Sequence, residues 1–225
     1  MTQARPPSLR APLKTKLVTG ILLVLVATWI FATIAADVMA GAAITNVDVQ
    51  LAHWFHSNAT VPLTRLVIFF THVHSTPGLL VLSAVFAVFL IRKRERFWLL
   101  TLTVAVPGGM LLNVALKHAF QRARPVFEEP LLSLGTYSFP SGHAAGSTVF
   151  YGMLAAYLIC NLRLWRWRLL IAMSSVVLVS LVAMSRMYLG VHYLSDVVAG
   201  IVESIGWLAF ILTSVAFMRQ WFQQD

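Results

Sequence analysis

Residues 17–36 read LVTGILLVLVATWIFATIAA, an uncharged and mostly apolar run. A helix needs about 20 such residues to cross a bilayer, and the core of a cleaved signal peptide is shorter, so we expect a retained transmembrane helix. Five further runs of this kind follow along the chain: Pro77–Ile91, Phe97–Leu116, Ala144–Leu162, Leu169–Ser185 and Val197–Met218, the last interrupted by Glu203. The sequence therefore predicts an all-α, polytopic membrane protein built as a bundle of six transmembrane helices.

The composition of the chain excludes a soluble globular protein. Of the 225 residues, 59% are hydrophobic and 11% are charged, whereas a soluble domain carries roughly 25% charged residues. The six apolar runs occupy half of the chain, so too few residues remain for a second, soluble core. We therefore predict a single membrane-embedded domain over residues 1–225.

The basic residues predict how the bundle is oriented. The net charge is +9, and most lysines and arginines lie before the first run, after the sixth, between runs two and three, or between runs four and five. This side of the membrane carries Arg5, Arg10, Lys14, Lys16, Arg92, Lys93, Arg94, Arg96, Arg163, Arg166, Arg168 and Arg219. The positive-inside rule makes it cytoplasmic, so both termini, including the basic segment 1–16, are expected in the cytoplasm. Because topology explains the charge, we expect no nucleic-acid partner.

Three motifs fall on the opposite, outer side, and the first is KHAFQRARP at residues 117–125. Lys117 and Arg124 are seven residues apart and would share a face if a helix ran on for two turns. Pro125 discourages such a continuation. Either cation alone is typical of an anchor that reaches from a helix end to the headgroups. Together they indicate one position for a negative charge.

The second motif, SFPSGH at residues 138–143, directly precedes the fourth apolar run. Ser141 can cap a helix, and Gly142 allows the backbone to approach a ligand closely. The unpaired N–H groups at such a helix start form an anion site. His143 beside them can donate a proton near neutral pH, which an ordinary helix cap would not need.

The third motif, SRMYLGVHYLSD at residues 185–196, connects the fifth and sixth runs. His192 and Asp196 are four residues apart at the expected start of the last helix, within reach of a carboxylate–imidazole hydrogen bond. Such a bond fixes the tautomer and leaves the other ring nitrogen free to attack or to accept a proton. Arg186 adds a further outer cation.

Phosphate is the ligand that best suits these groups, because lysine, arginine, backbone N–H and hydroxyl groups can satisfy several phosphate oxygens at once. Two imidazoles, one oriented by a carboxylate, can supply the nucleophile and the proton donor of an in-line displacement without a metal. The other histidines lack acidic or cysteine neighbours at metal-ligand spacing, so we expect neither a metal nor another cofactor. They are His53, His56, His118, and His72 and His74, the last two expected as interfacial residues in a loop before the second run.

In these three motifs the chain resembles the type 2 phosphatidic acid phosphatase superfamily. The family signature is Lys-x6-Arg-Pro, then Pro-Ser-Gly-His, then Ser-Arg-x5-His-x3-Asp, and residues 117–196 contain all of it in order. The resemblance implies that His192 is the nucleophile and forms a phosphohistidine, that Asp196 orients it, and that His143 protonates the leaving group. The residues that it implies for holding the phosphate are Lys117, Arg124, Ser141, Gly142 and Arg186.

The resemblance and the six spans together imply a multi-pass lipid phosphatase of a bacterial inner (plasma) membrane, with its active site facing the periplasm or cell exterior. The implied substrate is a lipid phosphomonoester or diphosphate, such as polyprenyl (undecaprenyl) diphosphate, phosphatidic acid or phosphatidylglycerophosphate. A lipid phosphotransferase that uses the same site stays open as an alternative. A six-span transporter is disfavoured because the interruption Pro107-Gly108-Gly109 in the third run has no counterpart three runs later. The expected partners are the lipid substrate and the bilayer, and no oligomeric state is predicted.

Overall fold

The computed structural model describes residues 13–221, and every regular element in this part of the chain is an α-helix. The helices are α1 (Leu13–Met39), α2 (Ala43–Ser57), α3 (Val61–Val73), α4 (Thr76–Arg92), α5 (Arg96–Phe120), α6 (Gly142–Asn161), α7 (Trp165–Tyr188) and α8 (Leu194–Trp221). The all-helical prediction is confirmed. Each of the six apolar runs lies within one helix, except that the run at 144–162 passes the end of α6 by one residue.

Five of these helices are long and apolar enough to cross a membrane, namely α1, α5, α6, α7 and α8. The run at 77–91 lies in α4, which has 17 residues. At about 1.5 Å per residue this helix is shorter than a hydrocarbon core of about 30 Å. α3 and α4 are bent by 51° at a short break, and together they are long enough for one span. By length and composition, the described residues therefore contain five candidate spans, or six when the bent pair counts as one.

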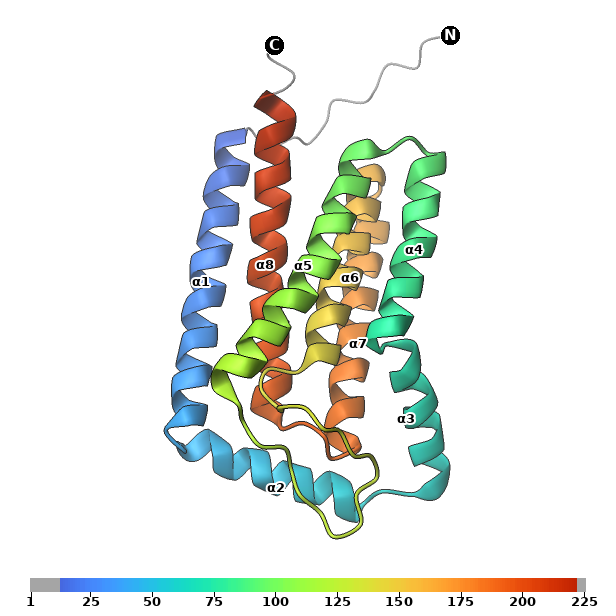
Figure 1. Ribbon diagram of the computed structural model, residues 1–225. Helices are drawn as coiled ribbons and strands as arrows, with labels where there is room; N and C mark the ends of the chain where they lie inside the picture. The colour runs from blue at the N-terminus through green and yellow to red at the C-terminus, as the bar shows by residue number, and fades with distance from the viewer. Residues whose placement is uncertain (1–12, 222–225) are drawn as a thin grey trace.

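The loop expected before the second run is instead folded into two helices, α2 and α3. α2 lies across the ends of the longer helices (Figure 1). Its sequence, AITNVDVQLAHWFHS, mixes polar and apolar residues and lacks the continuous apolar run that identifies a transmembrane helix. His72 lies in the last turn of α3, and His74 is the residue that caps its C-terminus. The prediction that both histidines lie in a loop is therefore wrong for His72.

The connections between helices sort to two ends of the bundle (Figure 1). One end carries the start of α1, the α4–α5 and α6–α7 turns and the end of α8. The basic residues predicted for one side of the membrane lie at this end, except that Arg5 and Arg10 fall outside the described residues. The opposite end, called the motif end below, carries α2, residues 121–141 and the turn between α7 and α8. All three motifs thus lie at the end opposite these basic residues.

The main core lies between α4, α5, α6 and α8 and is apolar. Pro107 interrupts the hydrogen bonding of α5 but does not end the helix. Trp207 of α8 packs against the glycines that follow, since a Cβ added to Gly108 would lie 2.5 Å from the indole ring. The indole N–H donates to the carbonyl of Ala105 (2.9 Å). The glycines that interrupt the third run therefore make room for Trp207, so that α8 can pack closely against α5.

Glu203 of α8 faces the interior of the bundle and is buried. Its Oε1 accepts a hydrogen bond from Nδ2 of Asn113 on α5 (2.7 Å). Oδ1 of Asn113 in turn lies 3.0 Å from the position that a Cβ on Gly142 would occupy at the start of α6. A carboxyl group inside a span is costly unless it faces the bundle and is paired. Glu203 faces the bundle and is paired through Oε1, which joins α8 to α5, whereas its buried Oε2 has no hydrogen-bond partner among residues 13–221.

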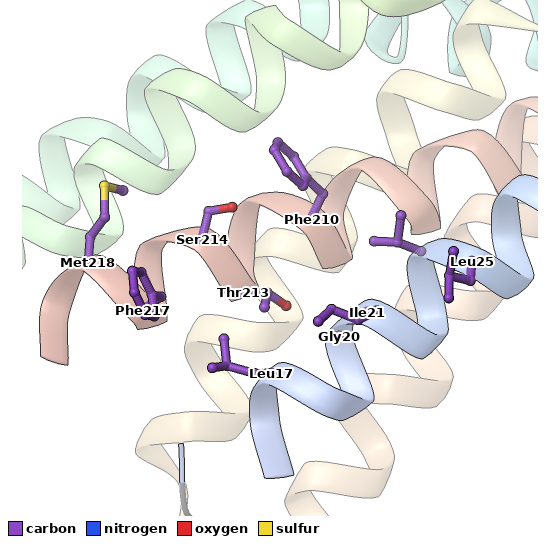
Figure 2. A pocket seen from close by; sticks show the side chains of 10 residues that line it. Leu17, Gly20, Ile21, Leu25, Phe210, Thr213, Ser214, Phe217 and Met218 are labelled. Atoms are coloured by element: carbon purple, nitrogen blue, oxygen red, sulfur yellow. The ribbon is translucent and has the colours of Figure 1, made fainter. Parts of the chain in front are cut away.

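A groove of about 520 Å³ lies between α1 and α8 (Figure 2). It lies toward the end of the bundle at which α1 begins and α8 ends, away from the motifs. Gly20 lets the two helices approach, because a side chain at this position would collide with Thr213. The groove is lined by Leu17, Gly20, Ile21, Val24, Leu25, Phe210, Thr213, Ser214, Phe217 and Met218. Its lining is largely apolar and contains none of the motif residues, so it is distinct from the site described next.

Candidate active site

The three motifs meet at the motif end, where four helices deliver their functional groups (Figure 1). α5 supplies Lys117 in its last turn, α6 begins directly after Ser141, and α7 supplies Arg186 in its last turn. Asp196 lies in the first turn of α8. The sharp turn from α7 to α8 passes through Gly190, whose φ of +67° is disfavoured for residues with a side chain.

His192 and Asp196 form a buried pair in which imidazole Nδ1 lies 3.4 Å from carboxylate Oδ2. The same Oδ2 accepts hydrogen bonds from the backbone N–H of Tyr193 (2.8 Å) and from the hydroxyl of Ser138, which hold the carboxylate in place. On the other side of the ring, Nη1 of Arg124 lies 3.2 Å from Nε2. A guanidinium can only donate hydrogen bonds. This contact therefore assigns the lone pair to Nε2 and the ring proton to Nδ1, facing the carboxylate.

The protonation state of His192 follows from its surroundings. Burial lowers the pKa of His192 to about 3, although the hydrogen bond and the charge of Asp196 raise it. The imidazole is therefore neutral at pH 7. A neutral ring that carries its proton on Nδ1 can act through Nε2 as a nucleophile or as a base.

Lys117 and Arg124 converge as predicted, but not along one helix. α5 ends at Phe120, and Gln121 adopts the left-handed conformation with φ 48°, so the helix does not continue to Arg124. Both cations instead donate to the backbone carbonyl of Tyr137, from Nζ of Lys117 at 2.8 Å and from Nη2 of Arg124 at 3.0 Å. The loop that contains Tyr137, rather than a shared helix face, brings the two charges together.

The start of α6 leaves polar groups available to a ligand. Ser141 is the N-cap residue, as predicted, but its side chain makes no capping hydrogen bond. Its Oγ is buried and has no hydrogen-bond partner among the described residues, while its backbone N–H donates to the carbonyl of Asp196 (2.9 Å). Gly142 follows as the first helical residue. A hydroxyl and the N–H groups of a helix start are therefore both placed at the motif end, where they can bind an anion.

Arg186 is 1% exposed. Its Nη1 donates to Oγ1 of Thr71 on α3 (2.6 Å), whereas Nε and Nη2 have no partner within residues 13–221. Buried polar groups are nearly always hydrogen-bonded, and a buried charge without a counter-charge is costly. The two unpaired nitrogens therefore indicate a position for an anion beside Arg186.

His143 lies in the first turn of α6. It interacts electrostatically with Arg186, His192, His74 and Arg124. The two motif histidines, which the sequence separates by a whole helical hairpin, therefore belong to one cluster at one end of the bundle. This cluster contains two imidazoles, a carboxylate and several cations, which are the groups that a phosphoryl-transfer reaction requires.

The histidines outside the motifs form no metal cluster. Within residues 13–221, no group of three or more His, Cys, Asp and Glu side chains is placed to hold a metal ion. His74, expected at the membrane interface, is instead buried, with Nε2 2.7 Å from the hydroxyl of Tyr151 and Nδ1 2.8 Å from the carbonyl of Phe70. His74 thus packs against α6 inside the protein, and its expected position at the membrane interface stays a prediction.

Two charged residues that contact the motif residues, Arg122 and Asp48, are not part of the family signature, so sequence reasoning did not identify them. Arg122 lies inside the first motif but outside its signature, and it donates to Oδ1 of Asp196 (2.6 Å) and to Oδ2 of Asp48 (2.8 Å). Asp48 is fully buried and comes from α2, 74 residues before Arg122. It is the sole acidic residue of that helix, which is the only sequence feature that distinguishes it.

Comparisons with known proteins cover the stretch that carries the motifs. A model of the PAP2 superfamily matches residues 96–221. The chain is similar to phosphatidylglycerophosphatase B of Bacillus subtilis, with 33% identity over 143 residues, which are 63% of this chain and 69% of that protein. It is also similar to an undecaprenyl-diphosphatase of Sulfolobus acidocaldarius, with 31% identity over 134 residues, which are 57% of this chain and 60% of that protein.

A solved structure extends the similarity beyond the motifs. The crystal structure of a transmembrane PAP2-type phosphatidylglycerolphosphate phosphatase from Bacillus subtilis matches with a TM-score of 0.75 and 28% identity. The match covers 85% of this chain and 94% of that chain. The helical arrangement, and not just the motif region, is therefore shared.

Proposed function

This chain belongs to the PAP2 superfamily and is similar to lipid phosphatases, and from this premise we propose that it hydrolyses a lipid phosphate or diphosphate through a phosphohistidine intermediate, without a metal. The observation that carries the proposal is the state of His192. Its ring proton faces Asp196, and its Nε2 lone pair faces the guanidinium of Arg124. A nucleophile for phosphorus needs this arrangement.

In the proposed first step, Nε2 of His192 attacks phosphorus, the bond from phosphorus to the leaving oxygen breaks, and His143 gives that oxygen a proton. Formation of the N–P bond makes the imidazole ring cationic, and Asp196 stabilises it through the Nδ1 proton. In the second step, water gives a proton to His143 and attacks phosphorus, which frees His192 and releases inorganic phosphate. The leaving group of the first step is a lipid alcohol for a phosphomonoester and a lipid monophosphate for a diphosphate.

The phosphate oxygens are held, in this proposal, by charged side chains, a hydroxyl and a helix start. The groups are Lys117, Arg124, Ser141, Gly142 and Arg186. Support comes from the free capacity of two of these residues, since Nε and Nη2 of Arg186 and Oγ of Ser141 have no other partner within residues 13–221. Arginine matches the geometry of phosphate with two parallel N–H bonds.

The substrate is proposed to be a membrane lipid, because the cluster lies at one end of the helices that span the bilayer. A lipid tail can remain in the bilayer while its phosphate reaches this end. The names of the similar proteins indicate phosphatidylglycerophosphate and undecaprenyl diphosphate as candidates, and phosphatidic acid carries the same reacting group. By the positive-inside rule the motif end faces the periplasm or cell exterior of a bacterial inner membrane.

Purified protein in detergent is expected to release inorganic phosphate from lipid phosphates or diphosphates with excess EDTA present. The panel contains phosphatidic acid, phosphatidylglycerophosphate and undecaprenyl diphosphate. Orthovanadate is expected to inhibit, because vanadium adopts the five-coordinate geometry that phosphorus has during in-line displacement. Activity that depends on added magnesium would contradict the metal-free step. Phosphate release that stays low while phosphate moves to an added acceptor lipid would instead identify a phosphotransferase.

The orientation is tested separately by a reporter fused after Asp225. Because the basic residues lie at the end opposite the motifs, the positive-inside rule places the C-terminus in the cytoplasm. A fused fluorescent protein is therefore expected to be bright, and fused alkaline phosphatase is expected to be inactive. The opposite pair of signals would place the cluster on the cytoplasmic face and overturn the proposed location.

A further inference from the structure

We propose that Asp48 is a positioning residue of the phosphatase reaction, which acts through Arg122 to keep a net negative charge behind the nucleophilic histidine. The inference rests on the proposed function, because it assigns a role to a residue that does not touch the reacting atoms. It is carried by a chain of contacts that runs from α2 to the buried pair of His192 and Asp196.

The first link of the chain is the carboxylate of Asp48, which is completely buried. Oδ1 accepts the backbone N–H of Ser195 in the first turn of α8 (2.9 Å). Oδ2 accepts the hydroxyl of Ser195 (2.5 Å) and Nη2 of Arg122 (2.8 Å). A carboxylate at a helix N-terminus satisfies an N–H group that has no partner within the helix. Asp48 therefore fixes the start of α8 at the residue that precedes Asp196.

The second link is the guanidinium of Arg122, which lies between two carboxylates. Its Nη1 donates to Oδ1 of Asp196 (2.6 Å) and to the hydroxyl of Ser195 (2.7 Å), while Nη2 binds Asp48. Its central carbon lies 4.3 Å from the centre of the Tyr193 ring. Although burial lowers the pKa of Arg122, the charges and hydrogen bonds of Asp196 and Asp48 outweigh this effect and raise it. The guanidinium is therefore a fixed cation.

The third link is the charge that His192 experiences. Phosphorylation of Nε2 makes the ring cationic, so the reaction is favoured when the group at Nδ1 is negative. Arg122 alone would neutralise most of the charge on Asp196, because the two are in contact inside the protein, where charges are poorly screened. The negative charge of Asp48 balances the positive charge of Arg122. Asp48, Arg122 and Asp196 together therefore carry one net negative charge. This balance is the role that we assign to Asp48.

The experiment compares purified variants in mixed micelles of detergent and phosphatidic acid. Asp48→Asn is nearly isosteric and keeps an acceptor oxygen, but it removes the charge. It is expected to lower kcat by about 10- to 100-fold, the range found when the hydrogen-bond partner of a metal-ligating side chain is mutated, and to leave KM within about twofold. Asp37→Asn is the matched control, because Asp37 is an exposed aspartate at the end of α1 on the same side. It is expected to keep wild-type kinetics.

The double variant Asp48→Asn/Arg122→Gln separates charge balance from a purely structural role. With both charges removed, Asp196 regains its full effect on His192, so kcat is expected to rise at least about fivefold above that of Asp48→Asn, as coupled sites deviate from additivity. If the ion pair of Asp48 and Arg122 had only a structural role, removal of Arg122 as well would lower kcat further. Rates are expressed per molecule in the monodisperse peak on size exclusion, so a loss of folded protein does not count as a loss of kcat.

The outcomes distinguish the proposed function from the role of Asp48. Wild-type protein without phosphate release, or His192→Ala with undiminished release, would overturn the proposed function itself. If the wild type releases phosphate and His192→Ala does not, a wild-type kcat in Asp48→Asn would overturn only the role of Asp48. A double variant no faster than Asp48→Asn would overturn the charge balance.

Discussion

Replacing His192 with alanine is expected to reduce phosphate release by at least about 1,000-fold in kcat, which is the scale found when a covalent nucleophile is removed. Alanine cannot form the N–P bond, so hydrolysis has to proceed by direct attack of water on the bound phosphate. The cations and the helix start that hold the phosphate remain, and KM is therefore expected to change far less than kcat. The measurement is phosphate release from phosphatidic acid or undecaprenyl diphosphate by purified protein in detergent.

The matched control for this variant is His72→Ala. His72 is exposed in α3, and its Nδ1 bonds to the carbonyl of Ile68 in its own helix (2.7 Å). This variant is expected to keep wild-type kcat and KM. If His192→Ala retained a tenth or more of the wild-type rate while it eluted as a monodisperse peak, a phosphohistidine at this position could not lie on the main reaction path.

The second large effect is expected from Asp196→Asn, which should lower kcat by about 1,000- to 10,000-fold, as when the carboxylate behind a catalytic histidine becomes an amide. Oδ2 of Asp196 faces Nδ1 of His192 at 3.4 Å and accepts hydrogen bonds from Ser138 and Tyr193. An amide that turns its NH2 group toward the ring favours the tautomer with the proton on Nε2, which blocks the attacking lone pair. The loss of the negative charge also destabilises the cationic ring of the intermediate.

This prediction is checked by measuring kcat and KM for Asp196→Asn beside wild type and Asp37→Asn. Asp196→Asn is expected to be slower than Asp48→Asn, because Asp196 contacts the nucleophile directly whereas Asp48 acts through Arg122. Asp37→Asn is expected to match wild type. A rate for Asp196→Asn within tenfold of wild type would mean that the carboxylate does not set the tautomer of His192, contrary to the geometry of the buried pair.

Most of the helical fold could be predicted from contiguous stretches of sequence. The apolar runs that begin with residues 17–36 each coincide with a helix, because the requirement for crossing a bilayer depends on the length and apolarity of one segment at a time. The length and apolarity of single segments do not predict α2 or the bend between α3 and α4. α2 is short and mixed in polarity, and the break between α3 and α4 is decided by how both helices pack on their neighbours.

Part of the candidate site could also be predicted from local sequence, and part depends on tertiary packing. Short-range spacing predicts that His192 and Asp196 meet and that α6 starts after Ser141, since these relations depend on local geometry. The two side chains do meet, but not across a turn of helix, because α8 begins at Leu194 and His192 lies in the turn before it. The spacing also predicts that Lys117 and Arg124 meet, although the loop around Tyr137 does this in place of a helix face.

The sequence by itself thus determined that this chain is a helical membrane protein with three phosphate-suited motifs on the side opposite most of its basic residues. Only the tertiary structure decided which residues support those motifs. Arg186 binds Thr71 across 115 positions of sequence, and Asp48 binds Ser195 across 147. No local pattern encodes such pairs, because their contacts depend on where α2, α3 and α7 pack relative to α8. Those packing positions are set by the shapes of many buried side chains together, and not by any single stretch of the chain.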